Sequence, residues 1–406
     1  MKKKIFLLAA ALLSLSVTAC ANQTPPIDDD NQNQNGGDNN GDNNGDDTVT
    51  YTDTKIENFD LLNDEEVRYL GRYIKKEVNG KEAMYLGFTC TGFELFVDVK
   101  SDTNKLTLDL YSEMLGGNVT QYLKTYIDGK ENTKIELQPG EQTVTLFENL
   151  TPGKHTLKLL KLNEASVSKL GLYALNTEGE VDYYHREYSS PRKKIEFYGD
   201  SLTCGYGNLG DPSIKIFRTQ DEDGSLTYAQ MLADKLDYDP TFVSCSGIAL
   251  SEILAPYGVD MMDQYNTVEG TIPYDMSLCS PDIVVMNLGS NDHGGYLAED
   301  ITQEKRDAGI EEFINNYSII MEPIFKNNPD CKVISVYNMC HAIDPGLIKA
   351  IKQATENLNE KYGEGTAFSL QLMNNQTGAN GHPDLIGHRT SYDTIYKFIE
   401  KEGLNK

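Results

Sequence analysis

The sequence lacks an excess of basic residues and, after its first 20 positions, any long apolar run. It holds 36 Lys and Arg against 62 Asp and Glu, a formal net charge of −26 over 406 residues. Nucleic acids and anionic lipid headgroups both require a basic surface, so this charge argues against either as a partner. No apolar run beyond residue 20 is long enough to span a bilayer. A hydrophobic fraction of 39% is still sufficient for a core, and the length predicts two domains.

Recognisable cysteine motifs are also absent. Apart from Cys20, the spacing of the cysteines matches no metal-binding motif and contains no C-x-x-C. Several of them lie inside or at the ends of predicted strands, which favours buried free thiols over disulfides. With no ligand cluster evident, the sequence predicts neither a metal nor a cofactor. The six positions are 90, 204, 245, 279, 331 and 340.

The N-terminus has the features of an export signal. Three Lys follow Met1, an apolar run covers residues 5–13, and small residues precede Cys20. The stretch Val-Thr-Ala-Cys resembles the lipobox of bacterial lipoproteins, which implies cleavage before Cys20 and lipid anchoring of the exported chain at that thiol. The alternative is an ordinary signal peptide with an incidental Cys. We predict a signal peptide over 1–19, then the lipidated Cys and a disordered Asn/Asp/Gly linker over 20–47.

Residues 48–190 carry the pattern of a β domain. Apolar residues recur there at every second position, as in Phe93, Leu95 and Val97. Turn signals such as the Asp-Gly pair at 128–129 separate these segments. Short alternating strands without helical runs predict an all-β sandwich.

Residues 191–406 carry a different pattern, in which short apolar strands alternate with helical stretches. One expected helix covers 310–321, with Pro323 kinking or ending it. This alternation predicts an α/β/α domain with a parallel five-stranded sheet, whose functional site lies beyond the carboxyl ends of the strands. The strands are expected at 194–198, 241–244, 282–288, 332–337 and 367–373.

A serine with catalytic potential follows the first of these strands. The sequence Gly-Asp-Ser-Leu occupies 199–202, so Ser201 falls at the start of a helix with its own N–H free. Taken alone, Asp200 and Ser201 are better explained as an ordinary helix N-cap.

Further hydrogen-bond donors follow the next two strands. Gly247 follows the second strand, and Gly289, Asn291 and Asp292 follow the third. The N–H groups of Ser201 and Gly247 and the amide of Asn291 are able to stabilise one oxyanion. For each group alone, ordinary turn chemistry is the alternative.

A serine nucleophile also needs a base. Three His lie near predicted strand ends, at positions 293, 341 and 382. His382 has the best setting, because it follows the last strand and precedes Pro383, which suits a first helical turn. His293 and His341 remain its rivals, and His388 is expected to pack in the core.

Together and in this order, these blocks resemble the SGNH (GDSL-type) hydrolase superfamily. The stretch 195–207 and the sandwich segments 126–130 and 150–164 further resemble the family 2 carbohydrate esterases. The resemblance implies a jelly-roll-like sandwich joined to a flavodoxin-like SGNH domain that removes acetyl groups from plant polysaccharides. It implies Ser201 as nucleophile and His382 as base. It also implies an oxyanion hole from Ser201, Gly247 and Asn291, with Gly289 and Asp292 in support.

Two features depart from the superfamily pattern. Many members place an Asp three residues before the catalytic His, where this chain has Ala379. The resemblance therefore implies a Ser–His dyad whose imidazole is oriented by a backbone carbonyl, with Asp200 bracing the turn. The chain also has no Trp, so Tyr206 is the candidate aromatic residue for an acetylated carbohydrate substrate. A lipase or aryl-ester hydrolase on the same fold, and a non-catalytic glycan-binding surface lipoprotein, are the alternatives.

Overall fold

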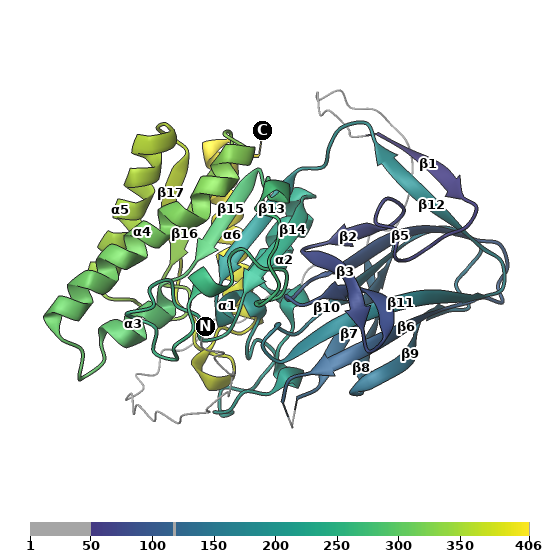
Figure 1. Cartoon of the computed structure of the whole chain (residues 1–406), viewed down its shortest axis with the longest axis horizontal. Coiled ribbons are helices and arrows are strands. Elements are labelled where there is room, and N and C mark those ends of the chain that lie inside the picture. Colours follow the sequence, from purple (N-terminus) through teal and green to yellow (C-terminus); the bar gives the residue numbers. More distant parts are fainter. Residues whose placement is uncertain (1–49, 117–118, 406) are drawn as a thin grey trace, which may run out of the picture. The chain divides into compact units, whose positions relative to one another are not determined.

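The computed structural model describes residues 50–116 and 119–405. The predicted signal, Cys20 and the linker lie outside the described residues. Two antiparallel sheets come first along the chain, and a parallel five-stranded sheet with its helices follows (Figure 1). The predicted fold class, a β domain followed by an α/β domain, is confirmed.

The β domain is a sandwich because alternate side chains of its strands face one core. Phe93, Leu95 and Val97 of one sheet pack with Leu106 and Leu108 of the other. The larger sheet has the order β1 (Tyr51–Ile56), β12 (Val181–Tyr188), β5 (Gly92–Val99), β10 (Gly153–Lys161), β7 (Gln121–Ile127), β8 (Lys130–Leu137), with β2 (Arg68–Leu70) on β5. The smaller has the order β3 (Tyr73–Val78), β4 (Lys81–Leu86), β11 (Ser168–Glu178), β6 (Lys105–Met114), β9 (Gly140–Glu148).

The parallel sheet has a hydrophobic core on each face. In its central strand, Ile283 and Val285 pack with helices α2 (Tyr228–Leu236) and α6 (Leu385–Glu402). Val284 and Met286 pack with α4 (Gln303–Asn327) and α5 (Pro345–Tyr362) on the other face. The strand order is β14 (Asp239–Ser244), β13 (Lys194–Gly199), β15 (Ile283–Asn287), β16 (Lys332–Tyr337), β17 (Ala367–Gln371).

Several expected boundaries differ from the structure, and two of these differences involve a proline. Helix α4 does not end at Pro323 but continues to Asn327, so the missing N–H of this proline is tolerated near the helix end. Strand β14 begins at Asp239 and includes Pro240, which the sequence did not predict. Because β14 is an edge strand, a proline costs it no central ladder bond.

The six cysteines predicted as free thiols are all buried and unpaired. Among the described residues, none of the helices is both long and apolar enough to cross a membrane.

A buried ion pair joins the sandwich to the amino end of β13. Arg72, between β2 and β3, is 1% exposed, and its Nη2 lies 2.6 Å from Oε1 of Glu196. Its Nη1 donates to the carbonyls of Tyr265 and Thr267 at 2.6 and 2.8 Å. The other oxygen of Glu196 accepts from the thiol of Cys279 at 2.7 Å. All the polar atoms of this carboxylate are therefore satisfied inside the protein.

We expect Arg72→Met to lower the free energy of unfolding by about 3–5 kcal/mol, because it leaves the buried Glu196 without its partner. Lys75→Met is the control, since Lys75 pairs with Glu82 at the surface and its loss should cost less than about 1 kcal/mol. Urea denaturation of both variants measures the difference. Equal, small losses would show that the Arg72 pair does not hold the two domains together.

Candidate active site

Ser201 is presented by a sharp exit from β13 into the short helix α1 (Ser201–Cys204). Gly199 is required there, because a Cβ at this position would lie 2.0 Å from Oγ1 of Thr203. Asp200 caps the helix by accepting the N–H of Leu202 at 2.9 Å. Ser201 is 8% exposed, and its N–H has no hydrogen-bond partner among the described residues. The turn thus directs both a hydroxyl and a free donor to the carboxyl end of the sheet.

His382 meets this serine directly. Its Nε2 lies 2.8 Å from Oγ of Ser201, and its Nδ1 lies 3.3 Å from the carbonyl oxygen of Asn380. Since a carbonyl can only accept, Nδ1 carries the hydrogen and Nε2 is free to accept the hydroxyl proton. No carboxylate takes part, because Asp384 caps α6 by accepting the N–H of Gly387 at 2.9 Å.

Backbone contacts hold the segment before His382 against the segment after α1. The N–H of Ala379 donates to the carbonyl of Gly207 at 3.0 Å, and that of Asn380 donates to Ile214 at 2.6 Å. The two segments lie far apart in the sequence. Their pairing therefore places the imidazole beside a serine that it follows by 181 positions.

The two rival histidines are not bonded to Ser201 within the described residues. The rings of His293 and His341 are 5.1 Å apart, and Nδ1 of His293 accepts the N–H of Asp344 at 3.0 Å. Neither has a hydrogen bond to Ser201 within the described part of the chain. His388 is fully buried, as expected, and accepts the N–H of Tyr228 at 3.2 Å.

Tyr206 is stacked on the imidazole of His382, so its ring is not an exposed surface for a sugar. Its ring is stacked on that of His382, with centroids 4.1 Å apart and planes 25° apart. Its hydroxyl accepts from Nδ2 of Asn380 at 3.1 Å. Tyr206 was predicted as a sugar contact, but the structure places it where it fixes the histidine and the carbonyl that orients it.

Burial lowers the pKa of His382 to about 4, and the carbonyl of Asn380 opposes this shift only in part. The imidazole is therefore neutral at neutral pH, as a base must be. The ordinary pKa of a histidine is about 6.5, so the surroundings of His382 hold its pKa well below the usual range.

The three groups expected to form the oxyanion hole differ in whether they already have a hydrogen-bond partner. Gly247 has a left-handed backbone (φ +78°), and its N–H has no partner among the described residues. The amide of Asn291, in α3 (Ser290–Tyr296), instead donates to the carbonyl of Ile248 at 2.9 Å and to Oδ2 of Asp200 at 3.3 Å. Two of the three donors are thus free, and the third is engaged within the protein.

Two buried carboxyl groups hold these elements in place. Asp200 contacts both Leu202 and Asn291, and burial raises its pKa to about 7. Asp292 accepts the N–H groups of Leu250 and Ser251 at 3.0 and 2.8 Å, and burial raises its pKa to about 6. Gly289 caps α3 in a left-handed conformation. These three predicted supporting residues shape the loops around Ser201 without contacting its hydroxyl.

Two residues at the site were not found from the sequence. Tyr257 is 64% exposed, and a Cβ on Gly247 would lie 3.0 Å from its ring. Glu164, in the sandwich domain, accepts the N–H of Ser246 at 2.5 Å. Segment 150–164 was noted only for its resemblance, and no spacing rule connects a sandwich residue with Ser246.

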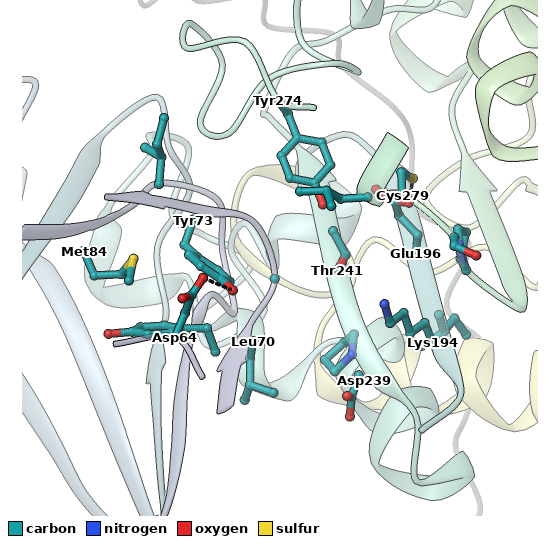
Figure 2. A pocket seen from close by; sticks show the side chains of 18 of the residues that line it. Asp64, Leu70, Tyr73, Met84, Lys194, Glu196, Asp239, Thr241, Tyr274 and Cys279 are labelled. Carbon is teal, nitrogen blue, oxygen red and sulfur yellow. Dashed lines mark hydrogen bonds between the residues drawn. The ribbon is translucent and has the colours of Figure 1, made fainter. Parts of the chain in front are cut away.

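A cavity of about 540 Å³ lies at the opposite end of the parallel sheet. Lys194 and Asp239, the first residues of β13 and β14, line one side, and Tyr73 of the sandwich lines the other (Figure 2). Ser201 and His382 do not line it. It is therefore separate from the serine site, which follows the carboxyl end of β13.

Comparison with protein families gives one match for each domain. Residues 70–181 match the family described as carbohydrate esterase 2 N-terminal, and residues 197–370 match the GDSL-like lipase/acylhydrolase family.

Curated relatives cover much of the chain. The cellulase/esterase CelE of Acetivibrio thermocellus is 28% identical over 362 residues, 83% of this chain and 39% of that protein. An acetylxylan esterase/glucomannan deacetylase of Cellvibrio japonicus is 27% identical over 209 residues, 46% of this chain and 53% of that protein. The chain thus spans about half or less of the length of these two relatives.

Solved structures share the fold. A family two carbohydrate esterase from Clostridium thermocellum in complex with cellohexaose has a TM-score of 0.69 at 22% identity, covering 83% of this chain and 99% of that one. An acetyl xylan esterase from Butyrivibrio proteoclasticus also has a TM-score of 0.69, at 21% identity, covering 87% and 100%.

The burial of His382 predicts a low pKa that can be measured without a substrate. In an NMR titration, the ring signals of His382 should have a midpoint near pH 4, so the ring stays neutral as the pH rises from there. Tyr206→Leu should move the midpoint up towards the ordinary value of about 6.5, because it admits water to the ring. Tyr206→Phe keeps the stacked ring and should leave the midpoint near that of the native protein. A native midpoint of about 6.5 would contradict the burial argument.

Proposed function

Because the chain pairs a carbohydrate esterase 2 N-terminal domain with a GDSL-like hydrolase domain, we propose that it removes O-acetyl groups from carbohydrates. The observation that carries this proposal is the 2.8 Å contact between Oγ of Ser201 and Nε2 of His382. A neutral imidazole at that distance is able to take the hydroxyl proton and make the serine nucleophilic.

The proposed reaction has two steps. Oγ of Ser201 attacks the acetyl carbonyl while Nε2 of His382 takes the hydroxyl proton. The bond from the acyl carbon to the sugar oxygen then breaks as His382 returns this proton to that oxygen, which leaves the acetyl group on Ser201. A water molecule deprotonated by the same nitrogen then attacks the acyl carbon. The bond from that carbon to Oγ of Ser201 breaks as His382 returns the proton to Oγ, and acetate leaves.

Three donors would stabilise the oxyanion formed in each step. Among the residues that the structure describes, the N–H groups of Ser201 and Gly247 have no hydrogen-bond partner, which supports their role. We infer that Asn291 exchanges its longer amide contact, 3.3 Å to Asp200, for the oxyanion. The raised pKa of Asp200 favours this exchange, because a neutral carboxyl group holds an amide less strongly than a carboxylate does.

The carbohydrate would lie on Tyr257. This exposed ring lies next to Gly247, and a tyrosine offers an apolar face to a sugar ring. The names of the relatives point to acetylated xylan and glucomannan as substrates to test. The export of the chain and its lipid anchoring at Cys20 remain part of this proposal.

A lipid or aryl-ester hydrolase is the second candidate, because the matched family of the α/β domain includes lipases and acylhydrolases. Acetyl and octanoyl esters of one alcohol distinguish the two: the proposal expects the acetyl ester to have the higher kcat/KM. A preference for octanoate would favour the second candidate.

We expect Asn291→Ala to lower kcat by about 10²–10³, which is the usual cost of one oxyanion donor, and Ser201→Ala to lower it further. Ser213→Ala, an exposed serine, is the control and should match the native protein. The measurement is acetate release from acetylated xylan. Near-native turnover by Ser201→Ala would remove the serine from its role, and equal, small losses in His382→Ala and His341→Ala would remove His382.

Tyr257→Ala tests the carbohydrate side alone. We expect KM for an acetylated xylo-oligosaccharide to rise about 3- to 10-fold, which corresponds to the loss of one aromatic contact. The kcat/KM for 4-nitrophenyl acetate, which has no sugar, should stay close to that of the native protein. An equal loss with both substrates would mean that Tyr257 supports the oxyanion loop and not the sugar.

A further inference from the structure

A buried acidic cluster lies directly behind the nucleophile. It consists of Glu164 from the sandwich, Cys204 at the end of α1, and Glu222 from the loop before α2. Their carboxylate oxygens and the sulfur lie within 4.8 Å of one another. Glu164 and Glu222 are 2% and 0% exposed. None of these three side chains has a part in the reaction described above.

The carboxyl group of Glu222 is bonded to the sandwich. Burial and the nearby charge of Glu164 raise the pKa of Glu222 well above its ordinary value, so Glu222 keeps its proton. Oε2 of Glu222 accepts from Nδ2 of Asn163 and from the N–H of Glu164 at 3.1 and 3.3 Å. Its Oε1 has no partner among the described residues and is free to carry that proton.

The carboxyl group of Glu164 is bonded to the oxyanion loop, because its Oε2 accepts the N–H of Ser246 at 2.5 Å. Nζ of Lys161 donates to the carbonyls of Asn163 and Glu164, and burial lowers the pKa of this lysine to about 7.

We propose that Glu164 is a positioning residue for the esterase reaction, acting from the sandwich domain through the Cys245–Ser246 peptide, which precedes the peptide that carries the N–H of Gly247. This inference rests on the proposed function. Gly247 has no side chain to fix its left-handed backbone, so the direction of its N–H depends on what holds the preceding peptide. A carboxylate bonded to Ser246 N–H fixes that peptide and leaves the N–H of Gly247 for the oxyanion.

Three substitutions at Glu164 separate position from charge. Glu164→Ala removes the acceptor, Glu164→Asp keeps the charge but withdraws the acceptor by one methylene, and Glu164→Gln keeps the acceptor without the charge. We expect Ala and Asp to lower kcat by about 10- to 100-fold, less than the full loss of an oxyanion donor, with KM little changed. Gln should restore kcat to within about threefold of the native value, a change of roughly 0.7 kcal/mol in the barrier.

Arg68→Ala is the matched control for general damage at the domain contact. Arg68 joins the sandwich to Asp239, at the amino end of β14 and away from Ser201. We expect it to lower the melting temperature without lowering kcat. Acetate release and thermal unfolding are measured for all four variants.

Labelling of Ser201 by a fluorophosphonate provides a second readout. There Oγ forms a bond to phosphorus, fluoride leaves, and the phosphoryl oxygen occupies the oxyanion site. The labelling rate should fall in Glu164→Ala and Glu164→Asp and persist in Glu164→Gln. This readout decides the inference even if acetate is not the product.

The outcomes divide clearly. The inference is overturned if Glu164→Ala and Glu164→Asp both keep the native kcat and labelling rate. It is also overturned if Glu164→Gln loses as much kcat and labelling rate as Glu164→Ala and Glu164→Asp do. An equal kcat loss in Arg68→Ala also overturns it. In each case the proposed function stands if the native protein releases acetate and Ser201→Ala does not. Failure of that comparison rejects the function separately.

Discussion

The site depends on one hydrogen bond between residues that the chain brings together from opposite ends of a domain. Ser201 follows β13 and His382 follows β17, and two other strands lie between these in the sheet. The contact exists because the segment before His382 pairs through its backbone with the segment after α1. The geometry of the base therefore depends on peptide groups and on the ring of Tyr206, and not on a third charged side chain.

Much of this arrangement could be predicted from the sequence, because it follows from local patterns. Period-two apolar residues located the strands, and the rule that sites follow the carboxyl ends of parallel strands led to Ser201, Gly247 and Asn291. The stacking of Tyr206 on His382, the engagement of Asn291 with Asp200 and the reach of Glu164 to Ser246 could not be predicted in this way. Each is a contact between segments whose relative position is decided only by packing.

The sandwich contacts the α/β domain at both ends of the parallel sheet. Arg72 pairs with Glu196 near the amino end of β13, whereas Glu164 reaches the loop after β14 at the carboxyl end. Both contacts are buried, and each satisfies polar groups that would otherwise be costly to bury. Movement of one domain against the other would break them together, so the two domains behave as one rigid support for the serine.

In the proposed reaction, the low proton affinity of His382 would also affect how the sugar departs. An imidazole that binds a proton weakly is, once protonated, a correspondingly strong acid. Within the described part of the chain, the carbonyl of Asn380 and no carboxylate lies behind the ring, so the imidazolium would lack a counter-ion and exist only briefly. A sugar alkoxide is a far stronger base, so the transfer of the proton to it would be steeply downhill. A carbonyl in place of a carboxylate would thus make activation of the serine harder and expulsion of the alcohol easier.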